Sequence, residues 1–199
     1  MRNKHDIYFE VSMIRDLVLK NRSYRRWVQD EAIEYETLKE FVDLARLCPS
    51  AANRQALKYI ISNDPQKNAL IFPYLHIDND PVEGERAAAH IIILEDQRIK
   101  MAMPCDFGIT AQTIMLAAVE KGLGGVMIGA INRPGLRKAL KLPPHLEILL
   151  VLALGKTIEQ MFIEPMRKDG STQQWWETKD IRHVPKRVLE DIIVDYPPK

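Results

Sequence analysis

The apolar positions of this chain fall into helix-like and strand-like segments. Between Ile109 and Val119, apolar residues occupy every side of a helical wheel, whereas a surface helix would show a single apolar stripe. Segments 11–20 and 37–47 instead carry apolar residues on one face, and Pro49 ends the second of them. We therefore predict two amphipathic helices and, later in the chain, a central helix that is covered on all sides.

Short apolar runs rich in Ile, Val and Leu predict strands, because each is bounded by turn-forming residues. These runs cover 58–62, 88–94, 125–131 and 146–154. A short helix is expected at 134–140, since Pro134 suits a first helical turn. Because the strands alternate with helices, we predict an α+β fold in which helices flank a central mixed or antiparallel sheet.

Composition fits an ordinary globular protein. The 199 residues, of which 46% are hydrophobic, are enough for one domain spanning 1–199. A net charge of +1 provides no global field for nucleic acid or an anionic membrane. The first ten residues lack the apolar core of a signal peptide, and the aliphatic run 148–154 is too short to span a bilayer. We expect a cytoplasmic protein without nucleic-acid or membrane partners.

Cysteine and histidine spacing does not predict a metal site. Cys48 and Cys105 are far apart and form no C-x-x-C motif, so reduced thiols are expected. His90 lies in a strand-like run and has no second histidine at H-x-x-x-H spacing. We interpret His90 as a core histidine whose hydrogen bonds are satisfied.

A glycine-rich turn follows the central helix, with four glycines within 122–129. Asp106 is the expected N-cap of that helix, and Gly122 is the expected left-handed residue after its end. The turn does not match G-x-G-x-x-G, because Met127 stands at the third glycine position, and no G-K-[ST] follows. The glycines indicate either a tight helix-to-strand connection or a shelf for a flat ligand.

Basic residues cluster at 21–27, which reads NRSYRRW. Arg22 and Arg25, with Ser23 between them, could present forked donors and a hydroxyl to one phosphate or planar carbonyl group. A solvated basic turn is the structural alternative. A nucleic-acid or partner-binding surface that also uses Arg26 and Trp27 is a third possibility, which the neutral net charge disfavours.

The segment 50–55, SAANRQ, is small and polar. Its small side chains allow close approach of a ligand, and the amides of Asn53 and Gln55 can donate and accept hydrogen bonds. A plain loop is the alternative.

Five segments together resemble the nitroreductase family of FMN enzymes, in order and spacing, over nearly the whole chain. They are NRSYRRW at 21–27, CPSAANRQ at 48–55, DFGITAQ and GLGGVMIG within 106–129, ALGK at 153–156, and HVPKR at 183–187. The resemblance implies an intertwined α+β homodimer. It also implies two FMN sites at the subunit interface, each drawing residues from both chains.

The resemblance assigns cofactor-binding residues in four groups, of which the first and the last both contact the phosphate of FMN. Arg22, Ser23 and Arg25 match phosphate and pyrimidine contacts; Ser50, Ala51 and Asn53 match the loop along the flavin and ribityl chain; Ile128 and Gly129 match the backbone at the N5 edge; Lys186 and Arg187 match the basic pair that completes the phosphate site. No catalytic acid, base or nucleophile is expected, because the flavin carries the electrons.

The implied activity is that of an FMN-dependent NAD(P)H oxidoreductase with a ping-pong reaction. NAD(P)H delivers hydride to FMN and leaves, and a nitroaromatic, quinone or similar electron-poor small molecule then accepts it. Reductive dehalogenation or flavin cleavage at the same site is the alternative. Two departures from the family pattern stand out: Asn21 replaces a basic residue of many relatives, and segment 76–80 looks short, which implies a more open acceptor pocket.

Overall fold

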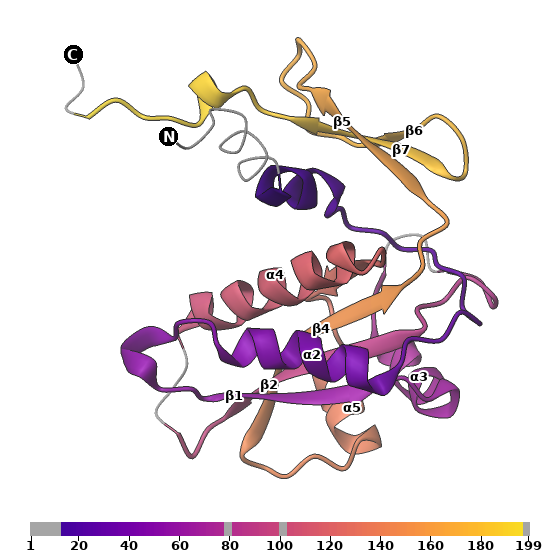
Figure 1. Ribbon diagram of the computed structural model, residues 1–199, viewed down its shortest axis with the longest axis vertical. Coiled ribbons are helices and arrows are strands. Elements are labelled where there is room, and N and C mark those ends of the chain that lie inside the picture. Colours follow the sequence, from indigo (N-terminus) through magenta and orange to yellow (C-terminus); the bar gives the residue numbers. More distant parts are fainter. Residues whose placement is uncertain (1–12, 78–80, 100–102, 197–199) are drawn as a thin grey trace, which may run out of the picture. The chain divides into compact units, whose positions relative to one another are not determined.

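The computed structural model describes residues 13–77, 81–99 and 103–196. Part of the segment 76–80, on which an expectation was placed, therefore lies outside the described residues. The chain divides into two compact units, Met1–Thr157 and Ile158–Lys199 (Figure 1). Each unit is described by itself, and the assignment of 1–199 to one domain stays a prediction.

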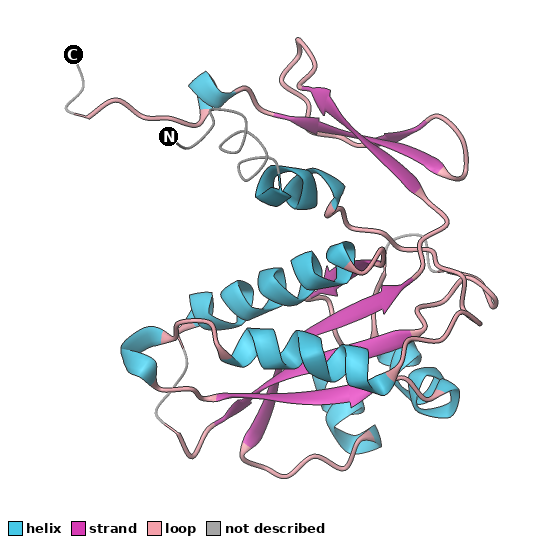
Figure 2. Cartoon of the chain, in the orientation of Figure 1, coloured by secondary structure: helices cyan, strands magenta, loops and turns pink. Residues whose placement is uncertain are grey.

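The first unit is built on a four-stranded antiparallel sheet with the strand order β1-β2-β4-β3. Its strands are β1 (Leu57–Ser62), β2 (Ala89–Asp96), β3 (Gly124–Ile128) and β4 (Leu146–Gly155). β2 is buried along nearly its whole length because β1 and β4 pair with its two edges and its side chains pack into a core on each face of the sheet. The four predicted strands and the α+β class are thus confirmed, and the sheet is antiparallel (Figure 2).

Helices cover both faces of this sheet (Figure 1). α2 (Tyr35–Arg46) and α4 (Pro104–Glu120) pack on the face that carries Ile91 and Ile93. α3 (Pro65–Ile71) and α5 (Arg133–Ala139) pack on the face that carries Ile92 and Leu94. Successive β2 side chains therefore supply two separate cores. Each such buried side chain contributes about 1.5–3 kcal/mol.

α4 is central, but it is not covered on all sides within this chain. It packs against α2, β3 and β4, and Ala111, Ile114 and Ala118 are fully buried. Ile109, however, is 39% exposed. The prediction that α4 is covered on all sides is therefore wrong for the single chain, because the side of the helix that carries Ile109 remains exposed.

The ends of α4 only partly follow the prediction. The helix begins at Pro104 with Met103 as N-cap, so the assignment of Asp106 as N-cap is wrong. Asp106 lies one turn inside and accepts a hydrogen bond from the Met103 backbone N–H at 3.2 Å. Gly122 has φ +74 directly after the cap residue Lys121, which confirms the predicted left-handed position.

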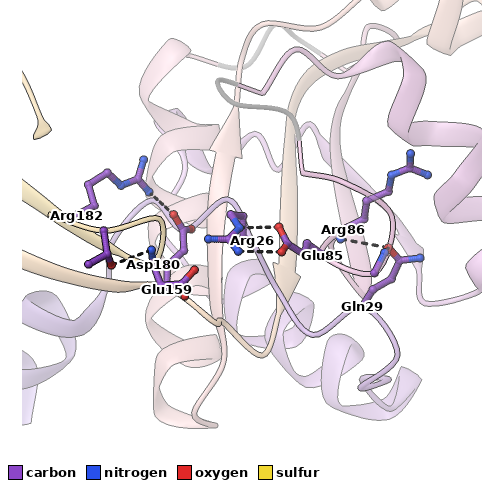
Figure 3. Close-up of polar contacts among 9 residues, drawn as sticks. Arg26, Gln29, Glu85, Arg86, Glu159, Asp180 and Arg182 are labelled. Atoms are coloured by element: carbon purple, nitrogen blue, oxygen red, sulfur yellow. Dashed lines mark hydrogen bonds and ion pairs between the residues drawn. The ribbon is translucent and has the colours of Figure 1, made fainter. Parts of the chain in front are cut away.

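The second unit is a three-stranded sheet of order β5-β7-β6 that the sequence did not predict. β5 (Gln160–Pro165) runs parallel to β7 (Ile181–Lys186), and β6 (Trp175–Trp176) runs antiparallel to β7. Its buried ion pair joins Arg182 to Glu159 at 3.2 Å (Figure 3). The apolar segment 189–194 that follows this sheet contains a short 3₁₀ turn, Leu189–Asp191, and its large apolar side chains are exposed.

His183 of β7 is the centre of a group of side chains that we call the His183 clamp, which also includes Phe162, Glu164, Trp175 and Glu177. The imidazole of His183 lies 5.6 Å from the ring of Phe162 and 5.0 Å from that of Trp175, in stacked arrangement with both. Its Nδ1 contacts Glu164 at 2.8 Å, and its Nε2 contacts Glu177 at 3.2 Å. Hydrogen bonding to Glu164 is the main reason that the pKa of His183 is raised above its ordinary value.

Among the described residues, no helix is both long and apolar enough to cross a membrane.

Candidate functional site

The segment around Tyr24 is attached to the start of β3. Ser23 forms a parallel bridge with Gly125, and the Tyr24 N–H donates to the Gly125 carbonyl at 3.0 Å. A Cβ at Gly124 would lie 2.6 Å from the Tyr24 ring, and one at Gly125 would lie 2.6 Å from the Ala153 carbonyl oxygen. These two glycines are required by the packing of the chain itself. They do not form an open shelf for a ligand.

Arg26 and Trp27 face the interior of the unit. The Arg26 guanidinium forms a forked ion pair with Glu85, with contacts of 2.6 and 2.8 Å (Figure 3). Trp27 is fully buried and donates from Nε1 to the Gly124 carbonyl at 3.0 Å. Because Arg26 is neutralised and Trp27 is inaccessible, the segment 21–27 does not present the continuous basic and aromatic surface that nucleic acid requires.

Arg22 has a buried hydrogen-bond donor that no described residue satisfies. Its Nη2 donates to the Val18 carbonyl, while its buried Nε has no hydrogen-bond partner among the described residues. Burial lowers the pKa of Arg22, which nevertheless remains a cation at neutral pH. Nearby, Arg25 Nη1 donates to the Ser23 carbonyl at 3.0 Å. A buried donor left unsatisfied costs about 1–3 kcal/mol, so Arg22 Nε is suited to an anionic ligand that would satisfy it.

The 50–55 loop is strained. Ala52, Asn53 and Gln55 have φ of 50, 52 and 51, which is the left-handed region that side chains other than Gly and Asn rarely adopt. Such strain costs of order 1–3 kcal/mol per residue and persists only where the surroundings impose it. The Gln55 N–H donates to Ser50 Oγ at 3.2 Å, which closes the loop on itself.

A buried carboxylate anchors this loop to α4. Asp106 is 3% exposed, and its Oδ1 accepts a hydrogen bond from the Ala51 N–H at 3.1 Å. The sequence analysis gave Asp106 a capping role only and missed this anchoring role. The only hint in the sequence was the presence of an acidic residue in the first turn of a helix that is otherwise largely apolar. Its partner, the Ala51 N–H, lies in a distant loop.

Ile128 and Gly129 lie where β3 ends. Ile128 is 4% exposed and packs in the core on the α3 and α5 side of the sheet. Gly129 is exposed, and a Cβ there would meet nothing within 4 Å. Its φ also lies outside the positive range, so the chain itself does not require glycine at this position. The backbone at Gly129 is open to a flat ligand.

The remaining assigned residues, Lys186 and Arg187, belong to the second unit. Lys186 is the last residue of β7, and both side chains are exposed. Their convergence with Arg22 and Arg25 on one phosphate stays a prediction.

Within the first unit, the assigned residues form two separate sets. The first set adjoins β3 and comprises Arg22, Ser23, Arg25, Ile128 and Gly129; the second is the loop set Ser50, Ala51 and Asn53, which leads into β1. β1 and β3 are opposite edges of the sheet, and three strand spacings of about 4.8 Å separate them by roughly 14 Å. The loop set is anchored at the beginning of α4, whereas Gly125 follows the end of that helix. The 17 residues of α4 separate its two ends by about 25 Å along the helix axis.

No cluster of three or more His, Cys, Asp or Glu side chains within 13–77, 81–99 and 103–196 could hold a metal ion.

The sheet, its two helical layers and the arginine-bearing segment at its edge define a nitroreductase-type α+β fold. The nitroreductase family model matches residues 82–156. A curated protein of Methanothermobacter thermautotrophicus, provisionally named NADH dehydrogenase/NAD(P)H nitroreductase, is 27% identical over 153 residues, or 73% of this chain and 78% of that protein. The chain is thus similar to the nitroreductase family in sequence over residues 82–156, and it shares the fold of solved members of that family.

Solved structures share the fold. A nitroreductase family protein from Clostridium difficile 630 superimposes with a TM-score of 0.63 at 25% identity, over 73% of this chain and 84% of that one. A nitroreductase from Exiguobacterium sibiricum, solved in complex with FMN, gives a TM-score of 0.65 at 17% identity, over 73% and 88% of the two chains.

Proposed function

We propose that this protein is an FMN-dependent oxidoreductase that takes hydride from NAD(P)H and reduces an electron-poor small molecule such as a nitroaromatic or a quinone. Similarity to the nitroreductase family supports oxidoreductase chemistry. The Exiguobacterium relative binds FMN, and the name of the Methanothermobacter relative includes NADH and NAD(P)H. FMN would supply the hydride-accepting and hydride-donating chemistry.

The residues of the chain would bind and orient the cofactor. Arg22, through its buried Nε donor, is suited to an anionic or electron-rich group, and Arg25 lies within the same short segment. Lys186 and Arg187 would add positive charge to the phosphate site. The open backbone at Gly129 would let the flavin edge approach the end of β3.

We further propose that two copies of the chain share each flavin site. The observation that carries this proposal is the separation of the two residue sets, which lie at opposite sheet edges and at opposite ends of α4. Residues that contact one flavin must all lie around that molecule, and the two sets of one copy lie far apart. The loop set of one copy would therefore contact a flavin that is bound by the β3 set of another copy. The exposed Ile109 row of α4 offers apolar surface for such an interface.

A mixed-dimer experiment tests the shared site. One variant carries Arg22→Ala and Arg25→Ala, and the other carries Asn53→Asp, which tolerates the left-handed backbone of this exposed position and would place a carboxylate beside the flavin. We expect each variant alone to purify without flavin. When the two are co-expressed with different tags and purified through both, one site of each mixed dimer has all its wild-type residues, so we expect one flavin per dimer by absorbance.

Two different failures are distinguishable. Mixed dimers without flavin, alongside a flavin-loaded wild type, would reject the shared site while leaving the flavin function intact. A wild-type protein that binds no FMN and oxidises neither NADH nor NADPH with nitrobenzoate or menadione would reject the function itself.

A further inference from the structure

A pocket lies in the first unit, between α3, the start of β2 and the 83–87 segment. We call it the α3 pocket; its volume is about 300 Å³, and its walls include Asn63, Asn68, Phe72, Arg86 and His90. None of the residues assigned to the flavin lines it. The volume lies at the lower end of the roughly 300–1,000 Å³ typical of small-molecule sites.

The hydrogen bonds of Asn68 fix the tautomer of His90. Asn68 Nδ2 donates to the Ala88 carbonyl at 2.7 Å, so its Oδ1 is the acceptor for the Ser62 hydroxyl at 2.8 Å and for His90 Nδ1 at 3.0 Å. His90 Nδ1 must therefore carry the proton. Nε2 then presents a lone pair and acts only as an acceptor.

That lone pair has no partner among the described residues. His90 is 2% exposed, and its Nε2 is buried without a hydrogen bond. Burial lowers the pKa of His90 to about 4, so the ring is neutral at physiological pH. A buried acceptor of this kind is stabilised by a ligand that brings an N–H or O–H donor.

Arg86 contributes the complementary group. Its Nη1 pairs with Glu83 at 2.5 Å, and its guanidinium lies 4.3 Å from the centre of the Phe72 ring. Its backbone N–H donates to Gln29 Oε1 at 3.2 Å, which fixes the main chain (Figure 3). Its Nε is buried and, within the described part of the chain, has no hydrogen-bond acceptor.

The charges around the pocket favour an uncharged ligand. Glu83 already neutralises Arg86, and Asp30 adds a further carboxylate to the wall. An anion would meet that carboxylate and the His90 lone pair, both of which are unfavourable to negative charge. A neutral ligand avoids both, while Phe72 and the alanines of the wall provide apolar contact.

We propose that the α3 pocket binds a small neutral carboxamide, with the amide N–H donating to His90 Nε2 and the carbonyl accepting from Arg86 Nε. A carboxamide carries the donor and the acceptor on neighbouring atoms and has no net charge. The pocket has room for one ring beside this group. This site is independent of the flavin.

Benzamide is the test ligand, with benzoate as the matched control of the same shape but without an N–H donor. In the full-length, flavin-loaded protein, we expect benzamide to bind and to shift the ¹⁵N resonance of His90 Nε2, as a newly accepted hydrogen bond should. We expect benzoate to bind at least about tenfold more weakly, because it loses a hydrogen bond and adds a charge.

Variants on the exposed surface of α3 locate the site without disturbing the core. Ala69 lines the pocket, whereas Gln66 on the same helix does not, and both are exposed. We expect Ala69→Phe to abolish benzamide binding and Gln66→Phe to leave it unchanged. Benzamide binding that survives Ala69→Phe, equal binding of benzoate, or an unshifted His90 Nε2 at saturation would each overturn the proposal.

Discussion

The surroundings of the two histidines His90 and His183 shift their pKa values in opposite directions. His90 is buried in β2 beside neutral hydrogen-bonding groups, and burial lowers its pKa to about 4. His183 lies in β7 between the carboxylates of Glu164 and Glu177, and hydrogen bonding to these raises its pKa. Desolvation dominates in the first region and charge-assisted hydrogen bonding in the second.

These shifts give the two regions opposite dependence on pH. A buried neutral base such as His90 resists protonation. Its contribution to the free energy of unfolding is therefore complete above pH 6.5, the ordinary pKa of histidine, and is lost as the pH falls toward 4. His183 is stabilised in its charged form. The contribution of His183 to the free energy of unfolding is complete below pH 6.5 and is lost as the pH rises through the raised pKa of this histidine.

The largest effect is expected from Asn68→Leu, which removes the neutral partner that distinguishes the His90 region. The buried Ser62 hydroxyl, His90 Nδ1–H and Ala88 carbonyl would all lose their partner. We expect a loss of roughly 3–5 kcal/mol in the free energy of unfolding at pH 7, measured by urea denaturation with circular dichroism.

Gln66→Leu is the control for that substitution, because it changes an exposed amide on the same helix. It should alter the free energy of unfolding by no more than about 0.5 kcal/mol. A loss below about 1 kcal/mol for Asn68→Leu would mean that the three groups find other partners, and the tautomer assigned to His90 would lose its basis.

The next effect is the acid sensitivity of the first unit. Between the ordinary pKa of 6.5 and the folded value of about 4, His90 should remove about 3 kcal/mol from the free energy of unfolding as the pH falls. His90→Phe should abolish that part of the dependence. Denaturation curves at several pH values for both proteins provide the measurement, and identical pH profiles would contradict the assignment.

The smallest effect is expected from His183→Phe, which keeps an aromatic ring between Phe162 and Trp175 but removes the charge facing Glu164 and Glu177. The variant should lose protection of the β7 amides against hydrogen exchange below pH 6.5 and match the wild type at alkaline pH. Equal loss at both ends of the pH range would show that ring packing, and not charge, holds the clamp together.

The sequence predicted the first unit better than the second, for reasons that lie in particular residues. Continuous apolar runs such as 88–94 can only be buried, so β2 and β4 were predicted within two residues at either end. β5 and β7 contain charged residues and a proline, and β6 has only two residues. Their stability depends on Arg182 with Glu159 and on the His183 clamp, which local periodicity does not reveal.

For the candidate site, sequence pattern and resemblance named residues but not their roles in packing. Arg25 and Arg26 are indistinguishable in the pattern, and the ion pair of Arg26 with the distant Glu85 is visible in the structure alone. Gly124 and Gly129 likewise belong to one glycine-rich turn, yet Tyr24 fills the space beside the first and nothing fills that beside the second. Contacts between residues far apart in the sequence decide both cases.

The distribution of the three tryptophans gives each compact unit its own fluorophore. Trp27 is fully buried in the first unit, whereas Trp175 and the 47%-exposed Trp176 belong to the second. Trp27→Phe would leave emission from the second unit only, and replacing Trp175 and Trp176 by Phe would leave emission from the first only. Denaturation of these two variants, followed by tryptophan fluorescence, would therefore reveal whether the two units unfold in one cooperative transition or in two.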